Sequence, residues 1–254
     1  MEQKVILWER KINLVLPKGV KMRIVICDWD IMFLKKMKNI IYKYAEVYKI
    51  ELVVDSFNSG EKLLNCKTQY NIAFLGYRLE GINGFDTAKI LRKKYSDISI
   101  VFVSEYTDFV FDAFEVNPYR FLVKPTSSKM IYEILNHFFD NYIKNNCLWI
   151  KNRDNTLCLN TSDIYFLEAD NKHCYIHLKE EVLSCNHTMA KVYSVLPKRN
   201  FSKINRAFVV NLDYVQKYNT KELLLNNKEN LTIGRNFLKS FKEDYRLFKQ
   251  PIEI

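Results

Sequence analysis

Charged and hydroxyl side chains follow short apolar runs in the first half of the sequence. Asp28 and Asp30 come just after the apolar residues 24–27, Ser104 closes a later run, and Lys124 follows another. Carboxylate oxygens can hold a divalent cation, whereas a lysine and a hydroxyl can bind the oxygens of a phosphoryl group. The sequence offers no nucleophile beside a general base, so we expect no catalytic activity.

Two segments in the second half carry basic residues and no acid. Residues 188–212 contain Lys191, Lys198, Arg199, Lys203 and Arg206, and residues 230–242 contain Arg235, Lys239 and Lys242. Either segment alone is typical of a solvated surface. Two such segments in one small domain are suited to neutralise the phosphates of a nucleic acid.

The composition describes a folded chain with a basic surface. Of its 254 residues, 48% are hydrophobic and 27% are charged, which excludes a disordered chain, and the net charge of +10 suits a polyanionic partner. The 6 glycines form no phosphate-loop motif and the 6 cysteines form no CxxC pair, so we expect neither a cofactor nor a metal. No apolar stretch is long enough to span a membrane, and we expect a cytoplasmic protein without membrane insertion.

The order of the elements in the first half predicts an α/β domain. We expect strands at 24–27, 51–56, 72–75, 98–104 and 120–125, and helices at 31–48, 84–95, 107–115 and 127–143. Strands that are apolar on both faces and are joined by helices form a parallel sheet covered on both sides. We therefore predict a flavodoxin-like doubly wound domain, with its site at the carboxyl ends of the strands.

From about residue 147 the apolar period changes to two, which predicts a mostly antiparallel β domain. We expect strands at 148–152, 156–160, 163–170, 173–179 and 181–185, a short helix at 188–196 and a closing helix from about 236. The predicted organisation is an extension of unassigned function at 1–21, an α/β domain at 22–143 and a β domain at 147–250.

The first domain resembles response-regulator receiver domains over about residues 22–140. The resemblance rests on Cys27-Asp28-Trp29-Asp30, on Phe74-Leu75-Gly76, on the turn at 79–86 and on residues 113–125. Receivers accept a phosphoryl group on an aspartate at the end of the third strand and hold Mg²⁺ with neighbouring carboxylates. Gly76 stands at the place of that aspartate, so the resemblance implies a degenerate receiver without a phosphoacceptor.

The remaining receiver positions are partly retained. Asp28 matches the first carboxylate and Trp29 replaces the second, while Asp30 fits a third acidic position; Ser104, Phe121 and Lys124 match the switch hydroxyl, the switch aromatic and the phosphate-binding lysine. The loss of carboxylates implies no Mg²⁺ site. For the retained residues we favour structural roles, with Lys124 paired to Asp28 and Phe121 in the core. We also hypothesise that the Trp29 indole fills the space vacated at Gly76.

The second domain resembles the LytTR DNA-binding domain. The matching segments are residues 163–170, 175–178, 201–212 and 231–239. The resemblance implies base contacts by His173, Arg206 and Arg235, and phosphate contacts by Lys203, Asn205, Asn236 and Lys239. We expect Asn211 to tie a turn, and His173 with His177 to bind no metal.

Together these features predict a sequence-specific transcriptional regulator of two-component or quorum-sensing type that acts independently of aspartyl phosphorylation. As in the related regulators, we expect a homodimer on double-stranded DNA with repeated half-sites. The alternative is an interaction protein whose pseudo-receiver sequesters a histidine kinase or an intact regulator. Cys174 and Cys185 could form a regulatory disulfide, although buried, inert thiols are the favoured interpretation.

Overall fold

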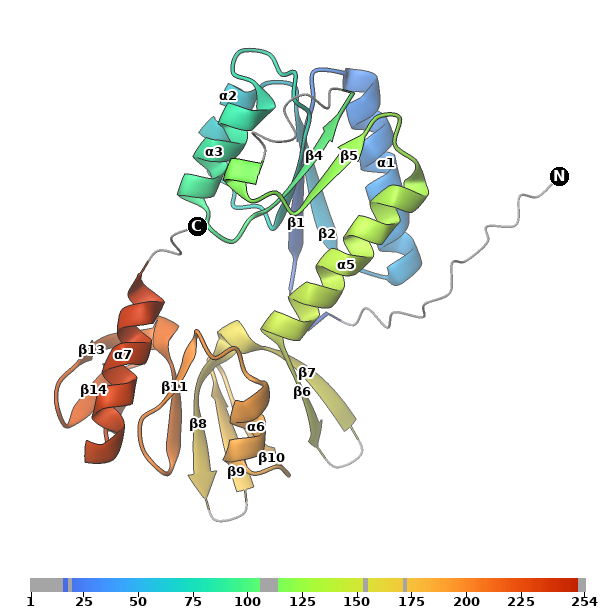
Figure 1. Ribbon diagram of the computed structural model, residues 1–254. Helices are drawn as coiled ribbons and strands as arrows, with labels where there is room; N and C mark the ends of the chain where they lie inside the picture. Colours follow the sequence, from blue (N-terminus) through green and yellow to red (C-terminus); the bar gives the residue numbers. More distant parts are fainter. Residues whose placement is uncertain (1–15, 18–19, 106–113, 153–154, 171–172, 251–254) are drawn as a thin grey trace. The chain divides into compact units, whose positions relative to one another are not determined.

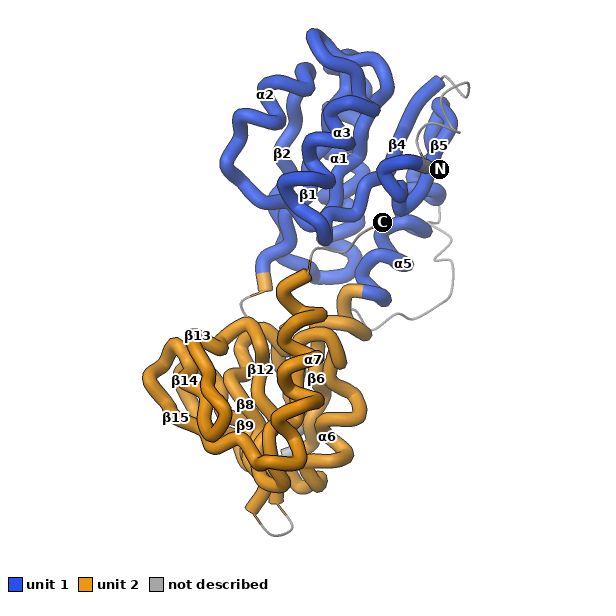
Figure 2. Tube along the Cα trace, turned by 60° about the vertical axis from the view of Figure 1, so that its left-hand side comes forward, with its two compact units in different colours: residues 1–15, 21–141 blue, residues 16–20, 142–254 orange. Residues whose placement is uncertain are grey.

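The computed structural model describes residues 16–17, 20–105, 114–152, 155–170 and 173–250. These residues divide into two compact units, one of residues 21–141 and one that consists mainly of residues 142–250 (Figure 2). The division falls inside the last helix of the first unit, because that helix runs to Asn146 and a strand begins at Cys147.

The first unit is a parallel sheet with helices on both faces (Figure 1). Its strands are β1 (Met22–Cys27), β2 (Leu52–Phe57), β3 (Ile72–Leu75), β4 (Ser99–Ser104) and β5 (Arg120–Val123), in the order β2-β1-β3-β4-β5. Its helices are α1 (Ile31–Tyr48), α2 (Gly60–Asn65), α3 (Gly84–Lys94), the short 3-10 helix η1 (Phe114–Val116) and α5 (Ser128–Asn146). The predicted flavodoxin-like fold class is confirmed.

The helices of this unit form two layers because each has one apolar face. On one side of the sheet α1 and α5 pack together, where Tyr44 stacks on Phe139 at 5.9 Å and donates a hydrogen bond to Asn136 over 2.8 Å. On the other side α2 and α3 bury residues such as Leu63 and Leu91 against the sheet. Figure 1 shows the same division, with α1 and α5 on one face and α2 and α3 on the other.

The second unit consists of three antiparallel sheets. The central sheet has the order β10-β9-β8-β12-β11 and contains β8 (Ile164–Asp170), β9 (His173–Leu178), β10 (Val182–Cys185), β11 (Phe201–Lys203) and β12 (Phe208–Asn211). Beside it lie the hairpin of β6 (Cys147–Asn152) and β7 (Asn155–Asn160), and a small sheet of β13 (Val215–Tyr218), β14 (Glu222–Leu225) and β15 (Asn230–Thr232). The helical elements are η2 (Thr161–Asp163), α6 (Met189–Val195), η3 (Leu212–Tyr214), η4 (Arg235–Phe237) and α7 (Leu238–Lys249).

Both faces of the central sheet are buried. Successive side chains of a strand point to opposite faces, so neighbouring residues belong to different clusters. Leu167 and Val209 join a cluster with α6 and β6, whereas Phe166 and Val210 join a cluster that contains the fully buried Phe241 of α7. Other elements of the unit therefore cover both faces of the central sheet.

Most predicted elements are present within a few residues of their predicted bounds, and the antiparallel nature of the second half is confirmed. The sequence did not predict α2, whose 6 residues are too few to show a period; it begins after Ser59, whose hydroxyl accepts from the N–H of Lys62. Most of the predicted helix at 107–115 lies outside the described residues. No described helix has the length and hydropathy needed to cross a membrane.

Candidate functional site

The carboxylate of Asp28, just after β1, pairs with the ammonium of Lys124, just after β5. Lys124 Nζ donates a hydrogen bond to Asp28 Oδ2 over 2.7 Å, and the Asp28 side chain is 1% exposed. The same ammonium lies 3.9 Å from the centre of the Phe33 ring, a cation–π distance. Burial raises the pKa of the Asp28 carboxyl, and the hydrogen bond from Lys124 opposes that rise. The favoured pairing of Lys124 with Asp28 is therefore confirmed.

One further oxygen of Asp28 and one oxygen of Asp30 accept hydrogen bonds from main-chain N–H groups. Asp28 Oδ1 accepts from the N–H of Asp30 over 3.0 Å. Asp30 Oδ1 accepts from the N–H groups of Met32 and Phe33, over 2.8 and 3.2 Å, and so caps the first turn of α1. Asp30 thus stabilises a helix end. Within the described part of the chain, no cluster of three or more acidic, histidine or cysteine side chains could hold a metal ion.

Gly76 follows β3, and the Asp28 carboxylate lies in the space that a side chain at this position would need. A β-carbon built on Gly76 would lie 2.4 Å from Asp28 Oδ2 and 3.0 Å from its Cγ, which is closer than van der Waals contact. The backbone is also tightly packed, because a β-carbon on Gly84 would lie 1.9 Å from the carbonyl oxygen of Gly76. A side chain at residue 76 would therefore require the Asp28 carboxylate to move from the position in which it pairs with Lys124.

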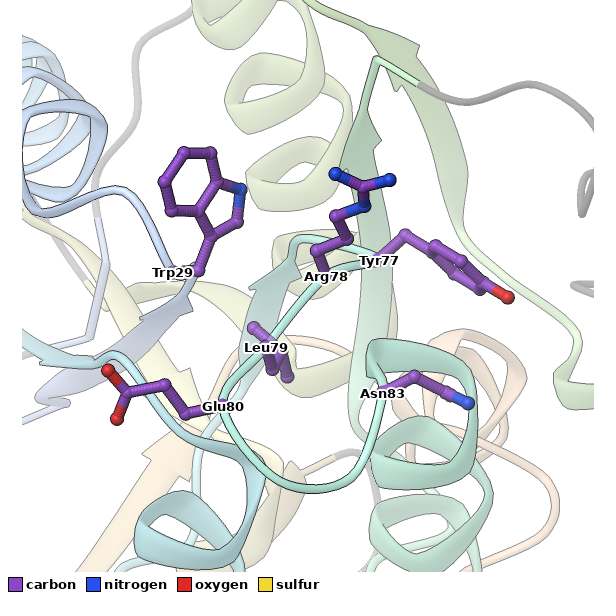
Figure 3. Close-up of a pocket in the computed structure, with 6 residues that line it drawn as sticks. All are labelled: Trp29, Tyr77, Arg78, Leu79, Glu80 and Asn83. Carbon is purple, nitrogen blue, oxygen red and sulfur yellow. The ribbon is translucent and has the colours of Figure 1, made fainter.

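Trp29 does not fill the space at Gly76, and that hypothesis is wrong. Its side chain is 54% exposed and lines a surface pocket with the loop that follows β3, which contributes Tyr77, Arg78, Leu79, Glu80 and Asn83. In Figure 3 the indole and the guanidinium of Arg78 extend to the same side of this pocket. The physical reason is that Asp28 already occupies the space, held there by Lys124.

Ser104 and Phe121 both contact neighbouring residues of the first unit. Ser104 is 3% exposed, and its carbonyl oxygen accepts from the N–H of Lys124 over 2.9 Å. Phe121 packs on Phe102 with ring centres 6.2 Å apart and borders the core cluster that contains Ile100. Phe121 was predicted to lie in the core; it is partly buried and packs against the core cluster from its border.

In the second unit, main-chain hydrogen bonds hold three loops next to one another. The β8–β9 hairpin contacts the β11–β12 loop, because Ala169 N donates to Ala207 O over 2.7 Å. That loop contacts the turn after β15, because Gly234 N donates to Ile204 O over 2.8 Å. We call His173 with residues 204–207 and 234–237 the reading edge; it lies at the end of the central sheet where β8 ends and β9 and β12 begin.

The structure brings the predicted base-contacting residues to this edge. His173, Arg206 and Arg235 are all exposed. Arg206 and Arg235 line the same surface pocket, whose other members are Asn205, Ala207, Gly234, Asn236 and Phe237. His173 begins β9 on the neighbouring hairpin. Two guanidinium groups and an imidazole are therefore exposed on adjoining segments of this edge.

The predicted phosphate contacts differ in their surroundings. Asn236 and Lys239 are exposed, and Lys203 is half-buried with its ammonium 5.9 Å from the Phe237 ring centre. Asn205 differs, because its amide group is hydrogen-bonded within the protein: its oxygen accepts from two main-chain N–H groups and its nitrogen donates to the carbonyl oxygen of Thr232.

The acid-free segment 188–212 does not form one continuous basic surface. Residues 198–199 precede β11, which runs toward the reading edge, so they lie at the opposite end of the unit. There Lys198 Nζ donates to the carbonyl oxygen of Tyr193 over 2.6 Å. Conversely, the exposed Asn186 and His187 follow Cys185, whose partner in the sheet is Cys174 next to His173. Neither residue could be predicted from the sequence, because only the pairing of β9 with β10 brings them close to His173.

Two further polar side chains, Asn211 and His177, have structural roles. Asn211 is 1% exposed; it donates to the carbonyl oxygen of Ile164 over 2.9 Å and accepts from Asp213 N, which confirms that it ties a turn. His177 contacts Glu168 at 2.8 Å and stacks on Phe166.

Cys174 and Cys185 face each other across β9 and β10 as fully buried free thiols. Burial raises the pKa of Cys174 to about 12, which disfavours the reactive thiolate.

Comparisons with known proteins agree with both halves. Residues 24–136 match the family model of the response regulator receiver domain, and residues 154–246 match that of the LytTr DNA-binding domain. The chain is 21% identical to the sensory transduction protein LytT of Bacillus subtilis over 238 residues, covering 87% of this chain and 98% of that protein. It is 23% identical to the sensory transduction protein LytR of Staphylococcus epidermidis over 245 residues, covering 86% and 94%.

Similar solved structures match one half each. The BeF3-activated DrrB receiver domain is 17% identical with a TM-score of 0.42, covering 48% of this chain and 99% of that one. A LytTr DNA-binding domain from Bacillus cereus is 20% identical with a TM-score of 0.36, covering 39% and 96%. With a receiver domain followed by a LytTR DNA-binding domain, the chain is a response regulator of the LytT/LytR type.

Proposed function

We propose that this response regulator binds specific double-stranded DNA sequences and regulates transcription without aspartyl phosphorylation of its own receiver. The observation that carries the proposal is the buried Asp28–Lys124 pair, whose carboxylate lies where a side chain at position 76 would be. By resemblance, that position is the place of the phosphoacceptor.

The acceptor carboxylate is absent from this pocket, and the acidic side chains and the lysine are already engaged. Gly76 supplies no carboxylate nucleophile. Asp28 uses one oxygen for Lys124 and the other for a main-chain N–H, while Asp30 caps α1. The ammonium that would bind phosphoryl oxygens is held by an internal carboxylate. These contacts support a receiver whose pocket residues keep a single set of contacts. Such a domain would serve as a structural or dimerisation module.

The reading edge supports sequence-specific binding. Arg206 and Arg235 can each donate two hydrogen bonds to a guanine, and His173 can bond a purine N7. Lys203, Asn236 and Lys239 surround them and are assigned to phosphates. We propose a homodimer that binds repeated half-sites, as expected for symmetric regulators.

Selection of genomic DNA fragments by the purified full chain at about 0.15 M salt tests this proposal. We expect a repeated motif to be enriched, and to be enriched equally with and without a small-molecule phosphodonor. Gly76→Asp should gain no phosphodonor response while Asp28 keeps its bond to Lys124, because a side chain at residue 76 has room only if the Asp28 carboxylate moves. Stimulation of wild-type binding by the phosphodonor would contradict phosphorylation independence, and the absence of any enriched motif would contradict the regulatory function itself.

An exposed apolar surface favours the alternative that the pseudo-receiver captures a histidine kinase or an intact regulator. Trp29, Ile31 and Met32, which precede and begin α1, are 54%, 58% and 72% exposed. Lys35 and Lys36 follow on the next turn and are also exposed. Neighbouring exposed apolar residues commonly mark a protein contact.

The alternative is tested by pairwise pull-downs with purified histidine kinases and phosphorylatable LytTR regulators from the same genome. If capture is the function, Met32→Glu should reduce it at least about tenfold, because a buried charge would replace a buried apolar contact. Val47→Glu is the matched control, since Val47 is 53% exposed at the other end of α1. Retention of no candidate, or equal loss in both variants, would contradict capture through this surface.

A further inference from the structure

The Asn205 side chain connects the two arginine-bearing loops of the reading edge. Its Oδ1 accepts hydrogen bonds from Ala207 N over 2.7 Å and from Phe208 N over 2.8 Å, which closes the turn that presents Arg206. Its Nδ2 donates to the carbonyl oxygen of Thr232 over 2.7 Å. Thr232 ends β15, three residues before Arg235. One amide group therefore contacts the backbone of both loops.

The main chain around Asn205 reinforces this connection. Gly234 N donates to Ile204 O over 2.8 Å, directly beside the side-chain bond to Thr232. The two segments approach closely, because a β-carbon on Gly234 would lie 3.4 Å from the Asn205 β-carbon and 3.1 Å from the Phe237 ring. The distance between the backbones at 205 and 234 is thus determined by direct packing as well as by hydrogen bonds.

The side chains of Arg206 and Arg235 are less restrained than the hydrogen-bonded Asn205 amide, because they lie on the surface. Arg206 and Arg235 are exposed and line one pocket together with Asn205. A long exposed side chain donates productively to a base edge only when its backbone is held in the correct place, since small displacements misalign both hydrogen bonds of a bidentate contact. The backbone positions of residues 206 and 235 therefore matter for readout.

We propose that Asn205 is a positioning residue that sets the spacing of Arg206 and Arg235, and that it does not itself contact phosphate. The ligand of this paired arrangement is B-form DNA with guanines at both contacted base pairs, because each arginine matches the O6 and N7 acceptors of guanine. This inference rests on the proposed DNA-binding function. It predicts that the two guanines are recognised together, through one shared backbone support.

A mutant cycle on the selected DNA separates positioning from direct contact. Asn205→Ala should weaken binding to the selected sequence about tenfold, the order of a coupling between neighbours in one network, and leave binding to random DNA unchanged. In the Arg206→Ala/Arg235→Ala background the same substitution should have no further effect. If Asn205 contacts phosphate, Asn205→Ala should instead weaken binding in that background and on random DNA as well. The slope of log affinity against log salt concentration should then fall by about one.

Two further variants keep the outcome interpretable. Asn205→Asp retains the acceptor for Ala207 N and Phe208 N, so the turn can form, and loses only the donor to Thr232. Its added charge acts on selected and random DNA alike, so the ratio of the two affinities should still fall about tenfold. Asn236→Ala is the matched control on the adjoining turn and should weaken both DNAs equally.

The results distinguish this inference from the proposed function. An unchanged ratio of selected to random affinity in both Asn205 variants, with a wild-type protein that selects a motif, would overturn the positioning role alone. A wild-type protein that selects no motif would overturn the DNA-reading function and this inference together. A ratio that falls in the wild-type background and stays constant in the double-arginine background supports the proposal.

Discussion

Replacing Lys124 by alanine is expected to lower the free energy of unfolding of the first unit by about 3–5 kcal/mol. The substitution leaves the Asp28 carboxylate, 1% exposed in the native protein, with a single main-chain N–H partner. It also removes the ammonium from the face of Phe33. Urea unfolding followed by hydrogen-exchange protection in β1 and β3 measures the effect in this unit.

The loss should depend on pH in a defined direction. Burial already raises the pKa of Asp28, and without Lys124 the pKa should rise further above the unfolded value of about 3.9. A raised pKa means that the protonated carboxyl is favoured in the fold, so the stability of the variant is greatest at low pH and falls as the pH rises through the raised pKa. The loss of unfolding free energy in Lys124→Ala relative to wild type should therefore be smaller at about pH 4 than at about pH 7.

A paired replacement is the control for this result. Asp28→Asn with Lys124→Met removes both charges and should recover most of the stability, because the cost arises from the unpaired charge. A Lys124→Ala variant that loses less than about 1 kcal/mol, the range of exposed pairs, would show that the pair is not buried in solution.

The second large effect concerns DNA recognition. Arg206→Ala and Arg235→Ala should each weaken binding to the selected sequence by about 1–3 kcal/mol, or about 5- to 150-fold. Each variant should also lose its preference at one base pair, since the removed guanidinium reads one guanine. Both arginines lie on the exposed part of the reading edge.

Affinity measurements on the selected sequence, on single-base variants of it and on random DNA decide the outcome. Lys203→Ala is the comparison, because loss of a phosphate contact should weaken every sequence alike. Equal losses on selected and random DNA for all three variants would contradict the assignment of Arg206 and Arg235 to base edges.

The elements that the sequence could predict are those whose pattern is local. The helix at 31–48 shows an apolar face over 18 residues, so its bounds follow from periodicity. The parallel and antiparallel halves follow from the change of period near residue 147. The six-residue helix α2 carries no such signal and depends on packing of Leu63 against the sheet.

The site residues that the sequence could not place depend on contacts distant in the chain. The space at Gly76 is taken by Asp28, 48 residues earlier, and this contact also leaves Trp29 on the surface. The engagement of Asn205 depends on Thr232, 27 residues later. Residue types indicated the kind of partner for each group, whereas the sheet pairings determined which groups remain available to a ligand.

Main-chain hydrogen bonds hold the loops of the reading edge together. The bonds between Ala169 and Ala207 and between Ile204 and Gly234 join main-chain atoms, so they do not depend on which side chains occupy positions 173, 206 and 235. Those three side chains are exposed and lie outside both buried clusters. On the proposed function, operator preference can therefore change by substitution at these positions while the main-chain bonds that hold the loops are retained.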